Sequence, residues 1–353
     1  MDEIQELLAQ WYEDHKRELP WRSEPSPYHV WLSEIILQQT RVNQGLDYFI
    51  RFVEKWPTLE DLSKATEEEV LKMWQGLGYY SRARNLHQCA RQVVENHGGA
   101  FPKDFENLRK LKGIGDYTAA AIASIAFDLP HAVVDGNVYR VLSRLYDIDT
   151  PINSTEGNKL FAQLAQNLLD KNHPGLHNQA LMEFGALQCL PQNPDCLRCP
   201  LQSHCLAFAH HTVDDRPRKL KKLKTKTRYF QYLVFRTDKH GLCLRKREGN
   251  DIWKNLYDFP CIESKKALSL DEIIGSNYFK DLVSDQKFII SRISPPYVHK
   301  LTHQTIIATF VEIKISSFLP TIKTKNILLA FENELGTYPV PMLIDNYLTN
   351  NKH

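Results

Sequence analysis

Four cysteines in one short stretch are the first residues whose type and spacing indicate chemistry. Cys189, Cys196, Cys199 and Cys205 follow the pattern C-x6-C-x2-C-x5-C. Four thiolates this close together can hold a metal centre, and iron–sulfur clusters are bound by sets of four cysteine thiolates. Structural zinc sites more often join two close cysteine pairs across a longer separation. The spacing therefore favours one [4Fe-4S] cluster per chain, with zinc as the alternative.

Two acidic residues stand in surroundings that would give them opposite charge states. Glu34 lies in the stretch 30–40 (VWLSEIILQQT), which as a helix is apolar on nearly every side and is expected to be buried. Burial raises a carboxyl pKa, so Glu34 is a candidate proton donor, although most glutamates are exposed or salt-bridged. Asp135 precedes another helix, where it would act as an N-cap and be held ionised by the helix dipole. A protonated and an ionised carboxyl together form the pair that cleaves glycosidic bonds.

A glycine-containing turn at 111–115 (LKGIG) is a candidate phosphate-binding site. Gly113 and Gly115 lie between a short helix expected at about 105–111 and a helix that begins at Asp116. Such a turn leaves backbone N–H groups free at a helix N-terminus, where they can bind a DNA phosphate. An ordinary helix–helix turn explains the two glycines equally well. The cysteine loop and a basic segment elsewhere in the chain favour nucleic acid.

The elements that would position these residues are helical over the first 208 residues. Ile4, Leu7, Leu8 and Trp11 fall on one helical face, and the stretch 66–69 (TEEE) has the form of a capping box. Further helices are expected at about 28–39, 41–55, 81–96, 116–127, 136–146, 155–170 and 176–187. Residues 1–208 are therefore predicted to form an all-α domain.

A change of composition follows this helical part. Residues 216–228 (RPRKLKKLKTKTR) carry eight basic residues and no acidic one, a pattern that is typical of an extended linker, which we place at 209–228. After the linker, β-branched and aromatic residues predict strands at 229–236, 241–247 and 305–315, and two helices are expected at 269–279 and 324–335. Residues 229–353 are therefore predicted to form a smaller α+β domain.

The overall composition excludes several classes of protein. The chain has 353 residues, of which 42% are hydrophobic and 24% charged, as in ordinary globular proteins and unlike disordered chains. No apolar run approaches the roughly 20 residues that cross a bilayer. The acidic N-terminus lacks the pattern of a secretory signal, and the seven cysteines cannot all pair as disulfides. We expect a cytoplasmic protein with no membrane partner.

The chain resembles the adenine DNA glycosylases of the MutY type, within the helix–hairpin–helix and iron–sulfur glycosylase superfamily. The similarity covers almost the whole chain in the family's order, and it includes the four-cysteine loop. Two segments beyond the linker resemble the MutT-like (Nudix-like) C-terminal domain of the family. The matching strings are LPWR (19–22), WLSEIILQQT (31–40), GLGYYSRARNLH (76–87), LKGIGDYTAA (111–120), VDGNVYRVL (134–142), NQALMEFGA (178–186), IWKNLYDFP (252–260) and THQ (302–304).

The resemblance implies a DNA repair enzyme that excises adenine mispaired with 8-oxoguanine or guanine in double-stranded DNA. The adenine would be flipped out of the duplex, because its glycosidic bond cannot be reached within the stack. Glu34 would protonate N7 of adenine and Asp135 would stabilise the sugar cation, while Asn137 and Tyr117 would position these groups. The enzyme would leave an abasic site and would act as a monomer on the chromosomal DNA of a bacterial-type cell.

The resemblance also assigns residues to two binding regions. The positions that match the adenine pocket are Trp21, Arg22, Gln39 and Gln179. The positions that match contacts to 8-oxoguanine or to the DNA are Thr40, Leu77, Tyr79, Gly113, Gly115, Thr302 and His303. Tyr79 would be a stacking wedge between bases, and the alternative for it is a core tyrosine.

Two departures from the family pattern have consequences. Leu301-Thr302-His303 stands where the family usually has Phe-Ser-His, so a hydroxyl and an imidazole are kept but an aromatic contact is lost. The C-terminal domain also has no REx2EE-type string, so pyrophosphatase chemistry is not expected. The competing interpretations are an endonuclease III-type glycosylase and lyase, and a non-catalytic iron–sulfur DNA-binding protein. Lyase chemistry needs a lysine where Tyr117 stands, and the presence of both Glu34 and Asp135 argues against a silent protein.

Overall fold

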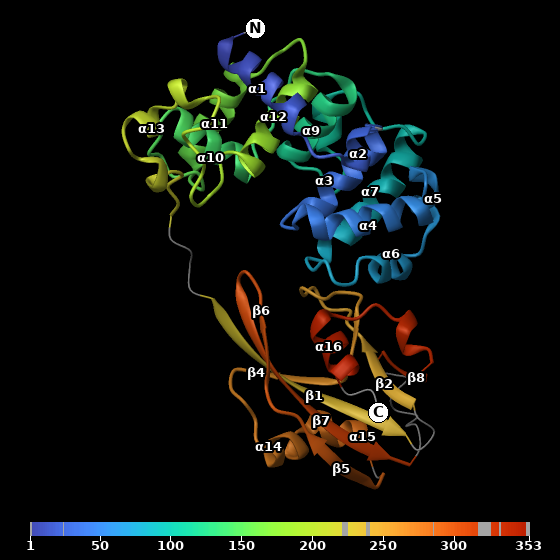
Figure 1. Cartoon of the computed structure of the whole chain (residues 1–353). Helices are drawn as coiled ribbons and strands as arrows, with labels where there is room; N and C mark the ends of the chain where they lie inside the picture. The colour runs from blue at the N-terminus through green and yellow to red at the C-terminus, as the bar shows by residue number, and fades with distance from the viewer. Residues whose placement is uncertain are drawn as a thin grey trace. The chain divides into compact units, whose positions relative to one another are not determined.

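The structure, a computed structural model, describes residues 2–23, 25–220, 225–237, 241–284, 286–316, 326–331 and 333–350. The chain divides into two units (Figure 1). The first unit consists of residues 1–64 and 85–222, and the second consists of residues 65–84 and 223–353. The second unit therefore includes a stretch of the helical half, which no pattern in the sequence indicated.

Helices and no strands occur among the described residues between 2 and 220, as the sequence predicted. The helices expected between positions 28 and 187 agree with those observed to within two residues at each end, whereas α2, α5 and α13 were not expected. None of the helices in the described parts of the chain is long and apolar enough to cross a membrane. The observed helices are α1 (Glu3–His15), α2 (Pro20–Ser23), α3 (Pro27–Leu37), α4 (Val42–Lys55), α5 (Leu59–Lys64), α6 (Glu67–Met73), α7 (Ser81–His97), α8 (Phe105–Arg109), α9 (Asp116–Phe127), α10 (Gly136–Leu145), α11 (Thr155–Leu168), α12 (Pro174–Leu187) and α13 (Leu206–Ala209), with short 3₁₀ turns at Gln202–His204 and Val213–Asp215.

Apolar faces of four helices form one core of the first unit. Leu8 and Trp11 of α1 pack with Val141 of α10, Phe161 of α11 and Phe184 of α12, and all five side chains are buried. The predicted capping box is also present, since Thr66 and Glu69 exchange side-chain and backbone hydrogen bonds at the start of α6. Periodicity and capping thus place these helices where the sequence predicted them.

The first part of the basic segment is attached to the first unit. The Nε atom of Arg216 lies 2.9 Å from Oδ1 of Asp147, and the Nε atom of Arg218 lies 2.9 Å from Oδ1 of Asp149. The backbone also takes part, because the N–H of Ile152 donates to the carbonyl of Arg218. The self-repulsion expected of a like-charged linker is therefore offset at these two arginines by carboxylates of the helical unit.

The C-terminal part of the second unit is built on a mixed eight-stranded sheet. The path of the sheet is β3-β2-β1-β7-β5, in which β1 runs parallel to β7 and the other neighbours are antiparallel; β4, β6 and β8 pair with β1, β7 and β2. The strands are β1 (Lys226–Thr237), β2 (Gly241–Lys246), β3 (Tyr257–Asp258), β4 (Cys261–Ser264), β5 (Phe288–Ile293), β6 (Tyr297–Lys300), β7 (Gln304–Ile315) and β8 (Ile327–Phe331). The helices of this part are α14 (Leu270–Gly275), α15 (Asn277–Val283) and α16 (Met342–Asn350), with a 3₁₀ turn at Leu335–Thr337.

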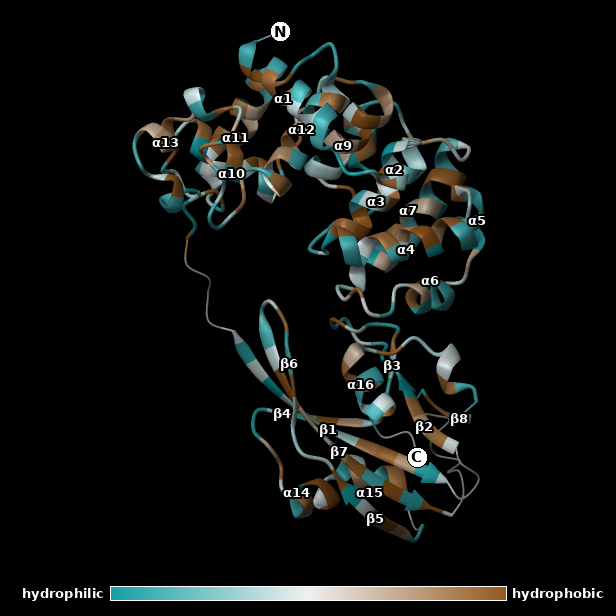
Figure 2. Cartoon of the chain, viewed as in Figure 1, coloured by the Kyte–Doolittle hydropathy of each residue, from teal (hydrophilic) through white to brown (hydrophobic). Residues whose placement is uncertain are grey.

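Both faces of the central strands are covered, which explains their nearly continuous apolar sequence. Figure 2 shows hydrophobic residues along β1 and β2. Phe235 of β1 and Ile313 of β7 pack with Phe279 of α15. Phe310 lies three positions before Ile313 on β7, so its side chain is on the opposite face of the sheet. It stacks on Tyr347 of α16 with ring centroids 3.9 Å apart. Helices therefore lie on both sides of the sheet.

Two helix predictions in this region need correction. The expected helix at 269–279 is two short helices, because Ser276 ends α14 and its hydroxyl caps α15. The expected helix at 324–335 is wrong, since residues 327–331 form β8; part of the expected stretch lies outside the described residues. A short apolar run cannot be assigned from periodicity alone, and the pairing of β8 with β2 decides its conformation.

Candidate active site

A cavity of about 570 Å³ in the first unit brings the two carboxyl groups to one place. Its walls come from α3, α9, α12 and the start of α10. A cavity of this size suits a small molecule or a nucleobase. The predicted site residues that line it are Trp21, Arg22, Glu34, Gln39, Thr40, Tyr117, Asp135, Asn137 and Gln179.

Glu34 is placed in the cavity wall by α3, whose other side chains are largely buried. Ser26 caps this helix by accepting a hydrogen bond from the N–H of His29, and Pro27 occupies its first turn. The hydroxyl of Tyr117, at the start of α9, donates to Oε2 of Glu34 over 2.6 Å. Burial raises the pKa of Glu34 to about 7, against the lowering effect of this hydrogen bond. A substantial fraction of Glu34 side chains is therefore protonated at neutral pH.

Asp135 is the N-cap of α10, as the sequence predicted. Its carboxylate accepts hydrogen bonds from the backbone N–H of Asn137 (2.9 Å), the N–H of Val138 (2.7 Å) and the side-chain amide of Asn137 (2.8 Å). Burial raises the pKa of Asp135 above its ordinary value in spite of these bonds, so the shift is opposite to that expected from the helix dipole alone. The negative charge of Asp135 in turn contributes to the raised pKa of Glu34. When the pair carries a single proton, that proton is therefore on Glu34 and Asp135 is ionised.

The sequence analysis missed Glu183, a buried carboxylate in the same cavity. Glu183 is 1% exposed on α12 and accepts two side-chain hydrogen bonds from each of Arg17 and Arg22, and a further one from the backbone N–H of Arg17. Although burial acts to raise it, these hydrogen bonds lower the pKa of Glu183 to about 2. The sequence feature that could have identified Glu183 is an acidic residue inside the otherwise apolar stretch 180–186 (ALMEFGA). Glu183 fixes the guanidinium of Arg22 at the cavity wall.

Gln179 and Trp21 also have defined neighbours at the cavity. The side-chain carbonyl of Gln179 accepts a hydrogen bond from the hydroxyl of Tyr12 (3.3 Å). Trp21 is buried edge-on against Phe49. Gln39 has a left-handed backbone (φ 55°) just after α3 and is exposed, and the next residue, Thr40, lines the same cavity as the carboxyl groups.

The glycine turn lies outside this cavity, at the N-terminus of α9. Gly113 has φ 78°, and a Cβ there would lie 2.7 Å from Cβ of Asn85, so this position requires glycine. Gly115 is the N-cap of α9 and leaves open space around its Cα. Arg109 pairs with Asp116 across the turn at 2.5 Å. The turn therefore has the tight form that the sequence predicted.

The other residues predicted to contact 8-oxoguanine lie in the second unit. Leu77 is buried, whereas Tyr79, Thr302 and His303 are exposed. Thr302 and His303 occupy the turn of the hairpin formed by β6 and β7. The hydroxyl groups of Tyr79 and Thr302 are hydrogen-bonded to each other. The fold thus brings together two polar groups that are more than two hundred positions apart in the sequence.

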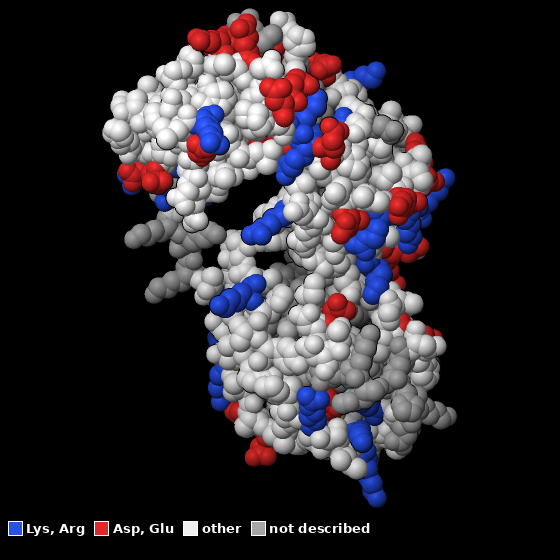
Figure 3. Space-filling model, viewed as in Figure 1, with Lys and Arg blue, Asp and Glu red and all other residues white. Residues whose placement is uncertain are grey.

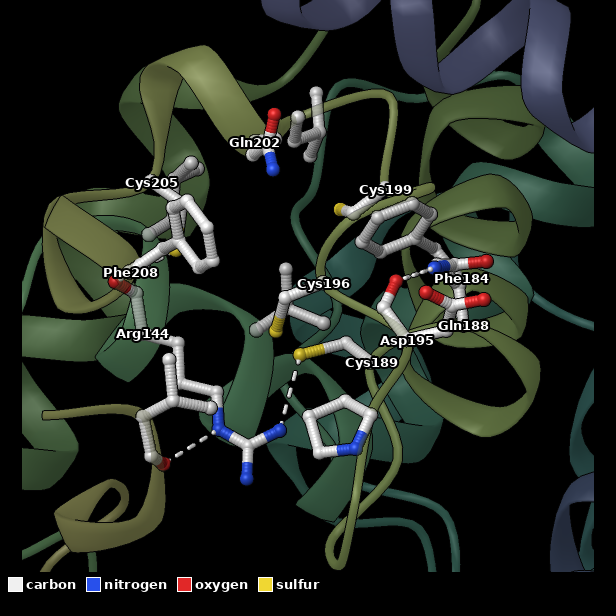
Figure 4. A pocket seen from close by; sticks show the side chains of 15 residues that line it. Arg144, Phe184, Gln188, Cys189, Asp195, Cys196, Cys199, Gln202, Cys205 and Phe208 are labelled. Carbon is white, nitrogen blue, oxygen red and sulfur yellow. Dashed lines mark hydrogen bonds between the residues drawn. The ribbon is translucent and has the colours of Figure 1, made fainter. Parts of the chain in front are cut away.

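The four cysteines line a second cavity in the first unit (Figure 4). None of the four is in a disulfide, and the guanidinium of Arg144 donates to Sγ of Cys189 over 3.3 Å. No three His, Cys, Asp or Glu side chains in the described part of the chain converge closely enough to hold a single metal ion. Four sulfur donors around one cavity are a donor set that a metal centre can use.

Charged side chains do not form one continuous patch on the face shown in Figure 3, where Lys and Arg alternate with Asp and Glu. This distribution agrees with a formal net charge of +2.

Comparison with known proteins gives concordant results. Residues 32–167 match the model of the HhH-GPD superfamily of base excision DNA repair proteins. The chain is 50% identical to the adenine DNA glycosylase of Mus musculus over 210 residues, which are 57% of this chain and 41% of that protein. It is 34% identical to the adenine DNA glycosylase of Buchnera aphidicola subsp. Baizongia pistaciae over 327 residues, which are 90% of this chain and 89% of that protein. The solved structure of a thermostable thymine-DNA glycosylase matches with a TM-score of 0.55 and 28% identity, and the match covers 59% of this chain and 95% of that chain.

Proposed function

Because the chain belongs to the family of adenine DNA glycosylases, we propose that it excises adenine paired with 8-oxoguanine or guanine in DNA and leaves an abasic site. The observation that carries this proposal is the pair of carboxyl groups in one cavity, with Glu34 partly protonated and Asp135 hydrogen-bonded as an N-cap. An acid and a carboxylate in this arrangement serve glycosidic bond cleavage. The match covers 41% of the mouse relative's length. The substrate and the reaction are therefore proposed for this chain from the residues of its own cavity.

The reaction begins with a flipped adenine in the cavity. Glu34 donates its proton to N7 of the adenine, and the bond between the base and C1′ of the sugar breaks with its electron pair moving to the base. The base leaves as neutral adenine, and the sugar becomes a cation. Asp135, fixed by three hydrogen bonds, lies ready to stabilise that cation, and Tyr117 orients the acid. Water then adds to C1′ and returns a proton to Glu34.

The test of this function is base release from a defined duplex. Full-length protein should release free adenine from an 8-oxoguanine:adenine pair, and more slowly from a guanine:adenine pair, with the strand intact until hot alkali is added. A preference for thymine glycol, or efficient strand cleavage without alkali, would support the endonuclease III alternative. The hydrogen bond of Tyr117 to Glu34 argues against that alternative, because the lyase reaction needs an amine at this position.

We further assign residues 1–208 to the glycosylase domain and 229–353 to a MutT-like domain that recognises 8-oxoguanine, joined by 209–228. Tyr79 and Thr302, hydrogen-bonded to each other in the second unit, are the residues best placed for this recognition. An exposed tyrosine ring can stack on a base, and an adjacent hydroxyl can hydrogen-bond to its edge. His303 lies beside Thr302 at the hairpin turn.

Removal of the Thr302 hydroxyl should weaken discrimination between the two mispairs. A hydrogen-bonding contact to a base is worth about 1–3 kcal/mol, or roughly a 10- to 100-fold preference. We therefore expect Thr302→Ala to lower the ratio of single-turnover rates on 8-oxoguanine:adenine and guanine:adenine by about tenfold. Thr302→Ser keeps the hydroxyl and should keep the ratio. An unchanged ratio in Thr302→Ala would exclude this hydroxyl from recognition.

The four cysteines would hold one [4Fe-4S] cluster. Such a cluster would stabilise the loop 189–205, which has few buried apolar residues of its own. Protein purified without oxygen should be yellow-brown and contain about four irons per chain. Cys199→Ser should lose the colour, whereas Cys89→Ser, at a lone buried cysteine, should keep it. Stoichiometric zinc in colourless protein would contradict the assignment.

A further inference from the structure

Residues 65–84 belong to the second unit, where they contact the C-terminal residues through a row of polar side chains. The carboxylate of Glu68 on α6 accepts hydrogen bonds from Nζ of Lys246 at 2.5 Å and from the hydroxyl of Tyr257 at 2.7 Å. Tyr257 is 5% exposed, so its hydroxyl needs a partner, and Glu68 supplies it. Lys246 holds the pKa of Glu68 below its usual range, so this carboxylate is ionised at neutral pH.

Further contacts fasten both ends of the same stretch. The amide of Asn255 donates to Glu67, and the guanidinium of Arg84 donates to the carbonyl of Lys254 over 2.8 Å. The hydroxyl of Tyr80 donates to the carbonyl of Val340 over 3.2 Å. These bonds come from positions before and after Tyr79, so the C-terminal residues hold the whole stretch.

The turn that carries Tyr79 depends on such support. Gly76, Gly78 and Tyr79 have φ angles of 104°, 72° and 47°, and the last is unfavourable for a residue with a side chain. The indole of Trp74 and the guanidinium of Arg82 both donate to the carbonyl of Gly78. The turn is therefore stiff, and a shift of α6 would move Tyr79 with it.

One loop of the C-terminal part connects the two residues proposed to recognise 8-oxoguanine. Trp253 packs against His299 of β6, in the hairpin that carries Thr302, with ring centroids 5.9 Å apart. The following residues of this loop, up to Tyr257, bind the stretch that carries Tyr79. The loop 253–257 thus holds both the hairpin and α6.

We propose that Glu68, bound by Lys246 and Tyr257, is a positioning residue that fixes Tyr79 against Thr302 and thereby sets the preference for 8-oxoguanine over guanine opposite adenine. This inference rests on the proposed function. Glu68 itself touches neither base in this role. It acts through the position of the Tyr79 ring and of the hydroxyl pair.

The experiment is a charge swap in full-length protein. Glu68→Lys and Lys246→Glu should each lower the ratio of single-turnover rates on the two mispairs by about tenfold, with the guanine:adenine rate within about twofold of the unaltered protein. The double variant restores an ion pair in reverse, and the Tyr257 hydroxyl can accept from the ammonium group introduced on α6, so it should regain most of the ratio. Glu95→Lys makes the same charge change at the exposed pair of Arg91 and Glu95 and should leave the ratio unchanged.

The outcomes separate the two proposals. If the unaltered protein shows no adenine release or no preference for 8-oxoguanine, the proposed function fails. If it shows the preference and the single variants keep the same ratio, or lose both rates equally, the role of Glu68 is overturned. Glu68→Lys in a Thr302→Ala protein should lower the ratio no further, because both changes remove the same contact. If one single variant fails to fold, the other single variant and the charge swap still decide the question.

Discussion

Glu34→Gln protein should bind its duplex as the unaltered protein does and release adenine about 10²–10⁴ times more slowly, the range that general acid catalysis contributes. The amide keeps the shape of the carboxyl group and can still accept the hydrogen bond from Tyr117, but it has no acidic proton to donate. The measurement is a single-turnover rate at saturating protein, with affinity measured separately. Normal turnover by well-folded Glu34→Gln would remove Glu34 from the role of acid.

The pH dependence of adenine release tests the same role of Glu34 in a protein that keeps its carboxyl group. Since the acid must be protonated and its pKa is about 7, the rate should fall as the pH rises through this value. Tyr117→Phe removes the hydrogen bond that lowers this pKa, so the fall should move to higher pH. A fall at the same pH in both proteins would show that another group titrates.

The raised pKa also links Glu34 to stability. Its pKa is higher in the folded protein than the value of 4.5 expected when unfolded, so the folded state binds the proton more tightly. The contribution of Glu34 to the free energy of unfolding is fully present below about pH 4.5 and is lost as the pH rises through about 7. Glu34→Gln should therefore unfold at a higher temperature than the unaltered protein at pH 8, and the difference should shrink towards pH 5.

Asp135→Asn should lower the rate of adenine release by about 10²–10³, similar to the loss of one preorganised electrostatic group in other active sites. Asparagine is also a good N-cap and can accept the two backbone hydrogen bonds that Asp135 accepts, so α10 should remain folded. What is lost is the negative charge that would face the sugar cation. The rate at pH 7 and the thermal unfolding temperature are the two measurements.

The matched control for this variant is Asp104→Asn. Asp104 caps α8 by accepting a hydrogen bond from the N–H of Asn107, but it does not line the cavity. This substitution should leave the rate unchanged, with a similarly small effect on unfolding. A rate for Asp135→Asn within tenfold of the unaltered protein would mean that hydrogen bonding by the cap, and not its charge, matters for the reaction.

Local patterns in the sequence were sufficient for most helices of the helical half, although α2, α5 and α13 were missed. Apolar periodicity, the capping box at Thr66 and the glycine turn depend on residues close together in the chain, and the structure has the predicted helices within two residues. The cysteine spacing is local as well, so it was enough to predict that the four thiols lie close together, and the structure places all four around one cavity. For the same reason, Glu34 in an apolar helix and Asp135 at a helix start could be identified as candidates before any contact was known.

Tertiary structure decided what depends on partners that are distant in the chain. The conformation of 327–331 follows from pairing with β2, and the ionised state of Glu183 follows from Arg17 and Arg22, more than 160 positions away. The pKa of Asp135 is raised because burial outweighs its cap hydrogen bonds, and burial is a property of the whole packed unit. The grouping of residues 65–84 with the C-terminal sheet likewise depends on hydrogen bonds between side chains nearly two hundred positions apart. A sequence pattern shows the periodicity of residues along the chain. Strand pairing, burial and pKa values depend instead on which distant residues pack together in the folded protein.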